Sequence, residues 1–307
     1  MFEIISQKKN KHWFYLTPAL IVLSIFTFFP LIKVCVISMT CYKQFYDVFE
    51  GFTFENYVKV CRDEEFQCAL RNTLLLVLFT VPISIFVALL IALALNNIKN
   101  YFFKNTFKFF FFFPLISNSI VMGMIFSILF YYNSGLLTNK PTGLFNSFIN
   151  MFGVSSCDWT GRTAPYINKM FVLILYNIWV RLPFKIFIFI LALENIDKSY
   201  YHAAKIDGAS KWRIFTKITC PLIMPIFFYQ FIIEMIAVFK EYDSVVGLFG
   251  DDPGFKMRTI VGYIYNQLSS SAHDFYSKGT VAAMILFVIF IFFTIMSVII
   301  FRKQQIN

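Results

Sequence analysis

Charged side chains are scarce in this 307-residue sequence. Only 14% of its residues are Asp, Glu, Lys or Arg, whereas 58% are apolar and 20% are aromatic. An average soluble domain carries about 25% charged residues. So few charges exclude a chain that folds in water as one or two soluble domains, and they predict an integral membrane protein.

Motifs for nucleotide, zinc and acyl chemistry are also missing. There is no Gly-x-x-x-x-Gly-Lys-Ser/Thr loop to cradle ATP phosphates, no His-Glu-x-x-His zinc motif and no Gly-x-Ser-x-Gly nucleophile elbow. The six cysteines include no Cys-x-x-Cys pair. Cys61 and Cys68 lie in a predicted outer loop and could pair with each other, but we interpret them as free thiols. We therefore expect a chain with no catalytic residues, no metal site and no cofactor of its own.

Long apolar runs are what the sequence does have. A helix needs roughly 20 apolar residues to cross a bilayer. Six stretches reach that length, at about 14–38, 73–95, 109–132, 167–193, 222–245 and 279–301. The first is too long for a signal peptide and lacks a small-residue cleavage site. The sequence therefore predicts an all-α membrane protein with six transmembrane helices in a single domain, residues 1–307.

Lysine and arginine predict the orientation of these helices, because both are enriched in short cytoplasmic segments. Thirteen of them fall in four short segments with few acids: Lys8, Lys9, Lys11, Lys99, Lys104, Lys108, Lys198, Lys205, Lys211, Arg213, Lys217, Arg302 and Lys303. The other connecting segments are longer and carry about as many acids as bases. We expect both termini to be cytoplasmic, and the net charge of +10 requires no nucleic-acid partner.

The longest polar interval on the cytoplasmic side runs from 198 to 221. Ser199 is the expected N-cap of a short helix and Gly208 its C′ residue, while Ser210 is expected to cap a second helix that leads to Pro221. A short capped helix between two spans buries little surface within its own chain. We interpret it as a segment that docks into the groove of a partner protein.

This loop resembles the Glu-Ala-Ala loop of binding-protein-dependent ABC importer permeases. That motif reads Glu-Ala-Ala, three residues, Gly, nine residues and Ile-x-Leu-Pro, and five positions match at the same spacing: Ala203, Ala204, Gly208, Ile218 and Pro221. The sequence departs from it at His202, which replaces Glu, and at Cys220, which replaces Leu. The resemblance assigns ATPase coupling to Tyr201, His202, Ala203, Ala204, Asp207, Gly208, Ile218 and Pro221.

Weaker matches to the same family lie elsewhere, among them 69–73 before the second span and 179–184 in the fourth. From the residues alone, Asn72 in the first of these is interpreted as a helix N-cap. The resemblance covers nearly the whole chain. It is strongest to the first of the two permeases in carbohydrate and glycerol-phosphate systems.

The resemblance implies a type I importer fold and a set of partners. A second permease, two ATPase subunits that bind ATP and Mg²⁺, and an external solute-binding protein would complete the transporter in a bacterial plasma membrane. The solute would be a sugar or a similar polar molecule. Three other interpretations stay open: an acyltransferase that uses the His-x₄-Asp spacing of His202 and Asp207, an uncoupled channel-like protein, and, for the loop alone, an amphipathic helix on the membrane surface.

Polar residues also interrupt two of the predicted spans. Charged groups inside a membrane are costly, so they normally face a cavity or a partner. Helical spacing places Asn177, Arg181 and Lys185 on one face of the fourth span, and Gln230, Glu234 and Glu241 share a face of the fifth. Arg181 and Glu234 are expected near the middle of the bilayer. They either pair with each other as part of the architecture or line a path for a polar solute.

Overall fold

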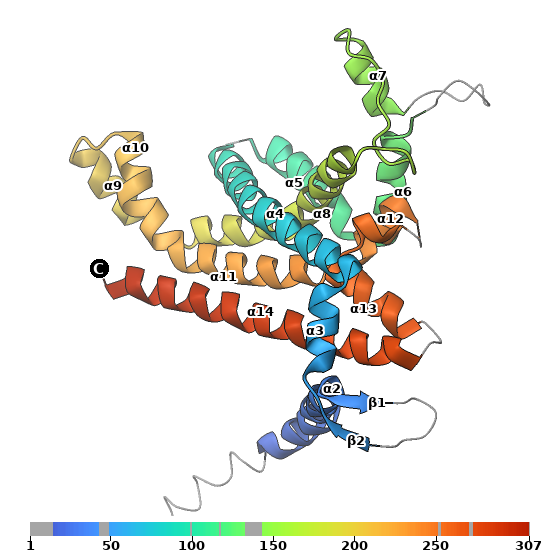
Figure 1. The fold of residues 1–307 in the computed structure, drawn as a ribbon. Coiled ribbons are helices and arrows are strands. Elements are labelled where there is room, and N and C mark those ends of the chain that lie inside the picture. The colour runs from blue at the N-terminus through green and yellow to red at the C-terminus, as the bar shows by residue number, and fades with distance from the viewer. Residues whose placement is uncertain are drawn as a thin grey trace, which may run out of the picture. The chain divides into compact units, whose positions relative to one another are not determined.

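The computed structural model describes residues 15–42, 49–98, 100–116, 118–132, 143–250, 253–269 and 273–306. The chain divides into two compact units, one of residues 1–66 with 263–288 and one of residues 67–262 with 289–307. Helices make up most of both units (Figure 1), which confirms the predicted helical fold class. Among the residues that the structure describes, five helical segments are long and apolar enough to cross a membrane.

The first unit opens with a helix from Tyr15 to Ser38 and continues into a small hairpin. Its early elements are η1 (Ser24–Phe28), α2 (Phe29–Ser38), β1 (Thr40–Tyr42), β2 (Phe49–Phe52) and α3 (Glu55–Arg62). The two strands, which the sequence did not predict, pair antiparallel. The Ser38 and Tyr57 hydroxyls lie 2.8 Å apart, and Asn56 Nδ2 donates to Thr40 O at 3.1 Å. These bonds fix the hairpin to α2 and α3.

Two later helices, α13 (Ile260–Ser269) and α14 (His273–Ile306), also contribute to the first unit. The Tyr263 hydroxyl donates to Asp63 at 2.9 Å, and the Tyr263 ring meets Phe66 edge-on with centroids 5.6 Å apart. Burial, followed by the bond to the Asp63 carboxylate, raises the pKa of Tyr263. The phenol therefore remains a hydrogen-bond donor at neutral pH.

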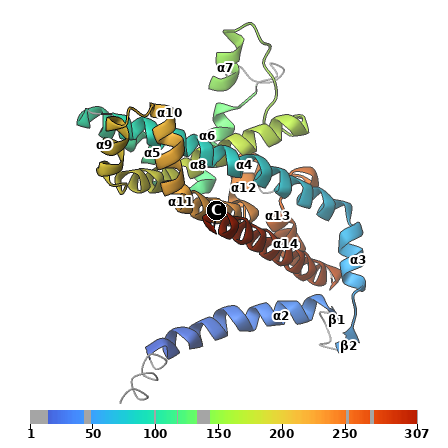
Figure 2. The same cartoon turned by 90° about the vertical axis from the view of Figure 1, so that its left-hand side faces the viewer.

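The second unit holds most of the residues predicted to be functional. Its elements are α4 (Glu64–Asn97), α5 (Tyr101–Ile116), α6 (Ser119–Leu129), α7 (Leu144–Asn150), α8 (Tyr166–Glu194), α9 (Lys198–Ile206), α10 (Lys211–Ile214), η2 (Phe215–Thr219), α11 (Cys220–Phe239), α12 (Asp243–Phe249) and η3 (Phe255–Met257). The central helix is α8, which packs against both α5 and α11 (Figures 1 and 2).

The third predicted span, 109–132, is not one continuous helix. Instead α5 ends at Ile116 and α6 starts at Ser119. Asn118 has an extended backbone, and its side-chain oxygen accepts from Ile120 N at 2.8 Å. An amide that caps a new helix in this way competes with continuation of the previous one. The other five predicted spans each overlap one of the five membrane-length helical segments of the described residues, and the predicted fifth span, 222–245, extends beyond the end of α11 at Phe239.

Two prolines are preceded by a π-helical turn. In η1 the turn ends two residues before Pro30, and in η2 it ends two residues before Pro221. A proline inside a helix removes one backbone donor and crowds the preceding turn. The wider π turn accommodates that defect without ending the helix. The membrane-length segment that corresponds to the fifth predicted span therefore starts at Lys211, well before the predicted boundary at 222.

Two glycines bring α6 and α12 into close contact. A Cβ atom on Gly123 would lie 2.8 Å from the Gly247 backbone, and one on Gly247 would lie 2.8 Å from Ile120 O. Any larger residue at either position would push the helices apart. This contact places the turn before α12, residues 240–243, next to α8 and α11.

Asn72 is not an N-cap, because α4 already begins at Glu64. Its side chain instead joins three parts of the second unit. The Tyr166 hydroxyl donates to Asn72 Oδ1 at 2.8 Å, and Asn72 Nδ2 donates to Lys256 O at 2.8 Å and to Arg258 O at 2.9 Å. With only 1% of its surface exposed, Asn72 is a buried clamp between α4, the start of α8 and the segment after η3.

Candidate functional site

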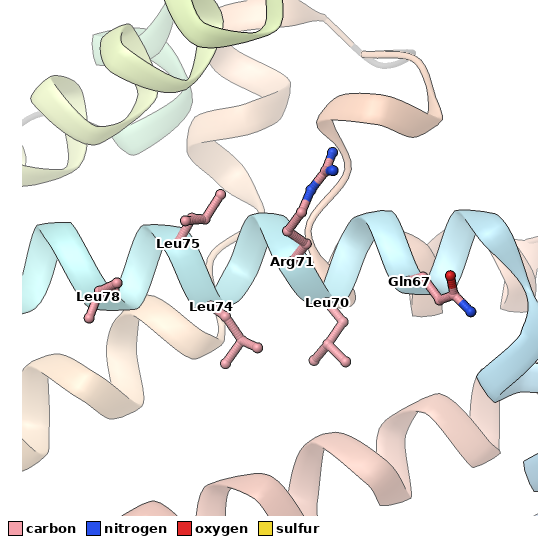
Figure 3. Close-up of a pocket in the computed structure, with 6 residues that line it drawn as sticks. All are labelled: Gln67, Leu70, Arg71, Leu74, Leu75 and Leu78. Atoms are coloured by element: carbon pink, nitrogen blue, oxygen red, sulfur yellow. The ribbon is translucent and has the colours of Figure 1, made fainter.

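The described residues of the second unit line several cavities, one of which is apolar. It holds about 340 Å³ and lies along α4, lined by Gln67, Leu70, Arg71, Leu74, Leu75 and Leu78. Leu70 and Leu74 point to one side of the helix, whereas Arg71 and Leu75 point to the other (Figure 3). Its polar groups do not converge on a common point. We therefore interpret this groove as a surface for lipid or for another helix, not as a solute site.

The six polar residues predicted in the fourth and fifth spans do come together between α8, α11 and α12. At the centre is an ion pair between Lys185 and Glu234, with Nζ 2.8 Å from Oε2. Both side chains are almost fully buried, at 2% and 6% exposure. The Ser84 hydroxyl from α4 lies 3.4 Å from Glu234 Oε1, and Lys185 Nζ also donates to Arg181 O at 3.1 Å. These contacts and the low exposure of both side chains show that protein atoms surround the Lys185–Glu234 pair.

A second ion pair joins Arg181 to Glu241 one helical turn away. Arg181 Nη2 bonds Glu241 Oε2, and it also donates to Ala237 O at 3.3 Å. Glu241 Oε1 accepts from Ser244 N at 2.9 Å, which ties the carboxylate to the first turn of α12. The Arg181 side chain is 20% exposed, so this pair, unlike the first, reaches an open space.

Two amides complete the network. Asn177 Oδ1 accepts from Arg181 Nε at 3.2 Å, while Asn177 Nδ2 donates to Leu173 O and to Ser244 Oγ at 2.9 and 3.1 Å. Gln230 Nε2 donates to Lys185 O at 3.3 Å. Both amides are about 99% buried. The two amides fix the positions of the ion pairs. Asn177 connects Arg181 to Ser244 of α12, and Gln230 connects α11 to the backbone of Lys185 in α8.

The pairing differs from the predicted contact between Arg181 and Glu234. Instead, Glu234 pairs with Lys185, and Glu241 pairs with Arg181. Arg181 and Lys185 are four residues apart on one face of α8, so either base was in reach of an acid on α11. The axial offset between α8 and α11 selects the observed pairs.

A polar cavity of about 280 Å³ opens beside Arg181 and Glu241. We call it the Arg181 cavity; it is lined by Ser119, Tyr176, Asn177, Val180, Arg181, Ala237, Lys240, Glu241, Tyr242 and Asp243. Of these, Tyr176 lies 3.0 Å from the Ser119 hydroxyl. Two tyrosines among charged and amide groups can offer both stacking surfaces and hydrogen bonds to a polar ligand. Lys185 and Glu234 do not line this cavity.

The loop between α8 and α11 forms the second candidate site. Helix α9 is capped by Asp197, whose carboxylate accepts from Ser199 N at 2.8 Å, so the predicted N-cap Ser199 is wrong by two residues. The bond from the Ser199 backbone lowers the pKa of Asp197. The cap is therefore ionised at neutral pH, as an N-terminal cap should be to complement the helix dipole.

The other two predicted boundary residues are confirmed. Gly208 has φ of +72° directly after the C-cap Asp207, and its N–H donates to Lys205 O at 3.1 Å. Ser210 Oγ accepts from Arg213 N at 3.3 Å and so caps α10. The Tyr201 hydroxyl lies 3.1 Å from Thr219 Oγ1, which links α9 to η2. The two short helices therefore form one corner that is continuous with α8 and α11.

Most of the residues predicted for coupling lie on this corner, and the corner also exposes two large apolar residues that the prediction did not include. Ala204 is buried at the base of α9, while His202, Ala203, Asp207 and Pro221 are exposed and Ile218 is half-buried. Ile206 and Trp212 are 86% and 73% exposed. Large apolar side chains in the most polar interval of the chain were the available signal. Exposed in this way, they are typical of a surface that inserts into a partner.

A cavity of about 510 Å³ lies beneath the corner. It is lined by Leu93, Asn96, Asn97, Leu193, Lys198, Tyr201, His202, Lys205, Lys211, Ile214, Phe215 and Thr219. His202 faces this space, whereas Asp207 is at the exposed end of α9. Five residues of helix turn by about 140° around the axis, so the two side chains leave α9 in different directions. This geometry opposes the acyltransferase interpretation, in which both must act on one acceptor.

The chain is similar to a known protein family and to named members of transport systems. The sequence model described as "Binding-protein-dependent transport system inner membrane component" matches residues 81–305. The arabinooligosaccharides transport system permease protein AraP of Bacillus subtilis is 28% identical, over 96% of this chain and 90% of its own length. The lactose transport system permease protein LacF of Rhizobium radiobacter is 27% identical, over 90% of this chain and 89% of its own.

Two solved structures share the fold. A chain from a bacterial ABC transporter involved in the import of the acidic polysaccharide alginate aligns with a TM-score of 0.77, at 20% identity and with 99% of each chain covered. A chain from the bacterial alginate ABC transporter in complex with alginate pentasaccharide-bound periplasmic protein aligns at 0.76, with 21% identity over 94% of this chain and 93% of that one. With the family match spanning more than two thirds of the residues, this chain belongs to the binding-protein-dependent transport system inner membrane components, the permeases of ABC importers.

Proposed function

We propose that this chain is one of the two permeases of an ABC importer that carries a sugar, an oligosaccharide or a similar polar solute into a bacterial cell. The observation that carries the proposal is the capped corner of α9 and α10, with exposed Ile206 and Trp212, at the junction of two membrane-length helices. Relatives named for arabinooligosaccharide and lactose transport support the solute class. Two ATPase subunits with ATP and Mg²⁺, a second permease and an external solute-binding protein complete the proposed complex.

The corner is built to transmit movement. Helix α9 follows α8 after a three-residue connection, and α10 runs through η2 into α11 without a break. A displacement of α9 by closing ATPase subunits would therefore pull on both helices that line the Arg181 cavity. We propose that this motion alternately opens that cavity to the two sides of the membrane, with the solute held near its midplane.

Solute contact is proposed for the members of the polar network that line the Arg181 cavity. Arg181 and Glu241 line the Arg181 cavity with Asn177, whereas Lys185 and Glu234 are enclosed. Hydroxyl-rich solutes are bound by charged and amide groups together with aromatic faces, and Tyr176 and Tyr242 supply the latter. Of the six residues predicted for the solute path, we therefore propose solute contact for Asn177, Arg181 and Glu241. We propose a structural role for Lys185, Glu234 and Gln230.

The proposed topology has six membrane crossings, with both termini in the cytoplasm. In it, α5 and α6 together make the third crossing, and the corner at α9 lies on the cytoplasmic side. A reporter enzyme fused after Asn307 should be active only in its cytoplasmic form, and one inserted at Asn150, after α7, only in its external form. An external C-terminus would contradict the six-crossing arrangement, in which both termini lie in the cytoplasm.

Gly208 provides the sharpest test of coupling. Its φ of +72° is unfavourable for β-branched residues, although no atom lies within 4 Å of a Cβ added there. We expect Gly208→Val to distort the end of α9 at a cost of about 1–2 kcal/mol or more and to reduce ATP-dependent uptake at least tenfold. Gly208→Asn, which tolerates this backbone conformation, should keep most of the uptake.

The assay uses the full complex in proteoliposomes, with radiolabelled oligosaccharides as solutes and ATP supplied on the ATPase side. Both variants should insert and co-purify with the partner permease, since the substitution adds no steric contact. If Gly208→Val imports solute at the wild-type rate, α9 is not the coupling element. If the wild-type complex imports none of the oligosaccharides in an ATP-dependent way, the proposed solute class is wrong.

A further inference from the structure

The cavity of about 510 Å³ beneath the corner of α9 and α10 is strongly basic. We call it the corner cavity. Of its twelve lining residues, four are lysine or histidine and none is aspartate or glutamate: Lys198, His202, Lys205 and Lys211. All four are exposed, so a partner can reach them from outside. The proposed solute path does not include this cavity.

Helix α9 supplies most of these bases from a single face. Lys198, Tyr201, His202 and Lys205 follow the i, i+3, i+4, i+7 spacing that places residues on one side of a helix. Lys211 lines the same space from the first turn of α10. Bases in a cytoplasmic loop help to orient a membrane protein wherever they lie in that loop. Orientation therefore explains how many bases the loop carries, but it does not explain why four of them line one cavity.

Hydrogen bonds within the corner fix the walls of the cavity. The Tyr201 hydroxyl and Thr219 Oγ1, which both line the cavity, lie 3.1 Å apart and join α9 to η2. Ser210 Oγ accepts from Arg213 N at 3.3 Å, which fixes the first turn of α10 and with it Lys211. The bases are thus positioned before any partner arrives, and such preorganisation lowers the entropic cost of binding.

The acids nearest to these bases in sequence are engaged elsewhere. Glu194 Oε1 lies 3.1 Å from Lys104 Nζ of α5, and the Asp197 carboxylate accepts from Ser199 N at 2.8 Å. Asp207 is the exposed C-cap residue at the other end of α9. None of the three acids lines the cavity. Close to the lining in sequence, the described part of the chain omits only residue 99, a lysine, and the side chain of residue 101, a tyrosine.

Exposed apolar side chains beside the bases indicate that the occupant is a protein. Tyr200, Ile206 and Trp212 are 55%, 86% and 73% exposed. Ile206 follows Lys205 and Trp212 follows Lys211, so a partner that buries the apolar residues also removes water from the bases next to them. Removing water from an unpaired charge is costly. A partner surface that supplies acids at these positions avoids that cost.

His202 changes the charge of this face relative to the Glu-Ala-Ala loop that it resembles. A glutamate at this position would lie four residues after Lys198 and three before Lys205. Acids and bases at these spacings pair on the surface of a helix. Histidine at 202 therefore removes the acid that would neutralise both lysines within α9, and it leaves them available to acids of a partner.

We propose that the ATPase subunit that docks on this corner presents acidic side chains to the corner cavity. These acids pair with the three lysines and accept a hydrogen bond from His202, while an apolar groove of the same subunit receives Ile206 and Trp212. An ATPase with bases at this position would be rejected by like charge. The inference rests on the proposed coupling function and specifies the chemistry of the partner surface.

The test measures how tightly the ATPase subunit binds to the permease pair in nanodiscs. The probe is the subunit that carries a Gly-x-x-x-x-Gly-Lys-Ser/Thr loop and co-purifies with the tagged wild-type permeases. Its Kd is measured at about 0.1 M and about 1 M salt, because the screening length falls from roughly 10 Å to roughly 3 Å between them. The test variant is His202→Glu, which introduces the residue of the motif and a good helix former.

Lys217→Gln is the matched control. Lys217 is an exposed base of the same corner that does not line the cavity. With histidine counted as neutral, both substitutions lower the net charge by one. His202→Gln is a second control, which separates the loss of the imidazole from the gain of an acid. Circular dichroism and size-exclusion chromatography verify that each variant is folded and paired with the second permease.

We expect His202→Glu to bind the ATPase subunit roughly tenfold more weakly than wild type at low salt, because the new acid repels those of the partner. Both controls should stay within about twofold of wild type, and the difference should shrink at high salt. Equal binding by His202→Glu and wild type would overturn the inference, as would an equal loss in Lys217→Gln. Tighter binding by His202→Glu would also overturn it and would assign bases to the partner surface.

These outcomes are separate from a failure of the proposed function. In each of them the wild-type permeases bind the ATPase subunit, so the coupling function stands. If the wild-type permeases bind no ATPase subunit, the proposed function itself is wrong. A titration with inorganic phosphate in the absence of the ATPase tests the other occupant. If His202→Glu loses phosphate binding but keeps its affinity for the ATPase, the cavity takes a small anion and the inference is overturned.

Discussion

Glu234→Leu should destabilise the folded permease by about 3–5 kcal/mol, the largest effect that we expect from a single substitution. The change removes the acid that pairs with Lys185 Nζ at 2.8 Å, and it leaves an ammonium group in a site with 2% exposure. The Ser84 hydroxyl would lose its Glu234 contact as well. Thermal unfolding of the detergent-purified complex measures the loss.

The double variant Lys185→Met/Glu234→Leu separates architecture from transport. It replaces a buried ion pair with apolar groups of similar volume, a change that is often neutral or stabilising. We therefore expect it to recover most of the stability lost in Glu234→Leu, and to recover uptake with it. A stable double variant that cannot import solute would contradict the assignment of this pair to architecture and return it to the solute path.

Arg181→Gln should reduce uptake by roughly 10- to 100-fold, the range expected for loss of a hydrogen bond to a charged group. Arg181 faces the Arg181 cavity with 20% exposure, so water can replace it beside Glu241. Glu241 also keeps its bond from Ser244 N at 2.9 Å. The expected loss of stability is therefore only about 1 kcal/mol, in contrast to Glu234→Leu.

The measurement compares uptake, unfolding temperature and ATP hydrolysis for Arg181→Gln and Arg181→Lys. Arg181→Lys keeps the charge but not the planar fork, and we expect an intermediate uptake. Basal ATP hydrolysis should survive in both, because α9 and its contacts are unchanged. Wild-type uptake in Arg181→Gln would exclude solute contact, and a stability loss as large as that of Glu234→Leu would assign Arg181 to the architecture as well.

Local sequence determined much of this protein. Apolar runs of sufficient length set five of the six predicted helices, since burial in a bilayer depends on composition along one segment. The positive φ at Gly208 and the Ser210 cap were also predictable, because both depend on residues within a single turn. Helical periodicity likewise placed Asn177, Arg181 and Lys185 on one face of α8.

Tertiary structure decided how those local elements combine. Arg181 and Lys185 are interchangeable by spacing, and only the axial position of α8 against α11 assigns Lys185 to Glu234 and Arg181 to Glu241. The role of Asn72 as a clamp depends on contacts with residues more than 90 positions away. The division of the third span at Asn118 and the choice of Asp197 over Ser199 as a cap follow from where the chain leaves the preceding helix. Each of these outcomes depends on where one segment lies relative to another. The periodicity and helix propensity of a single segment carry no information about that placement.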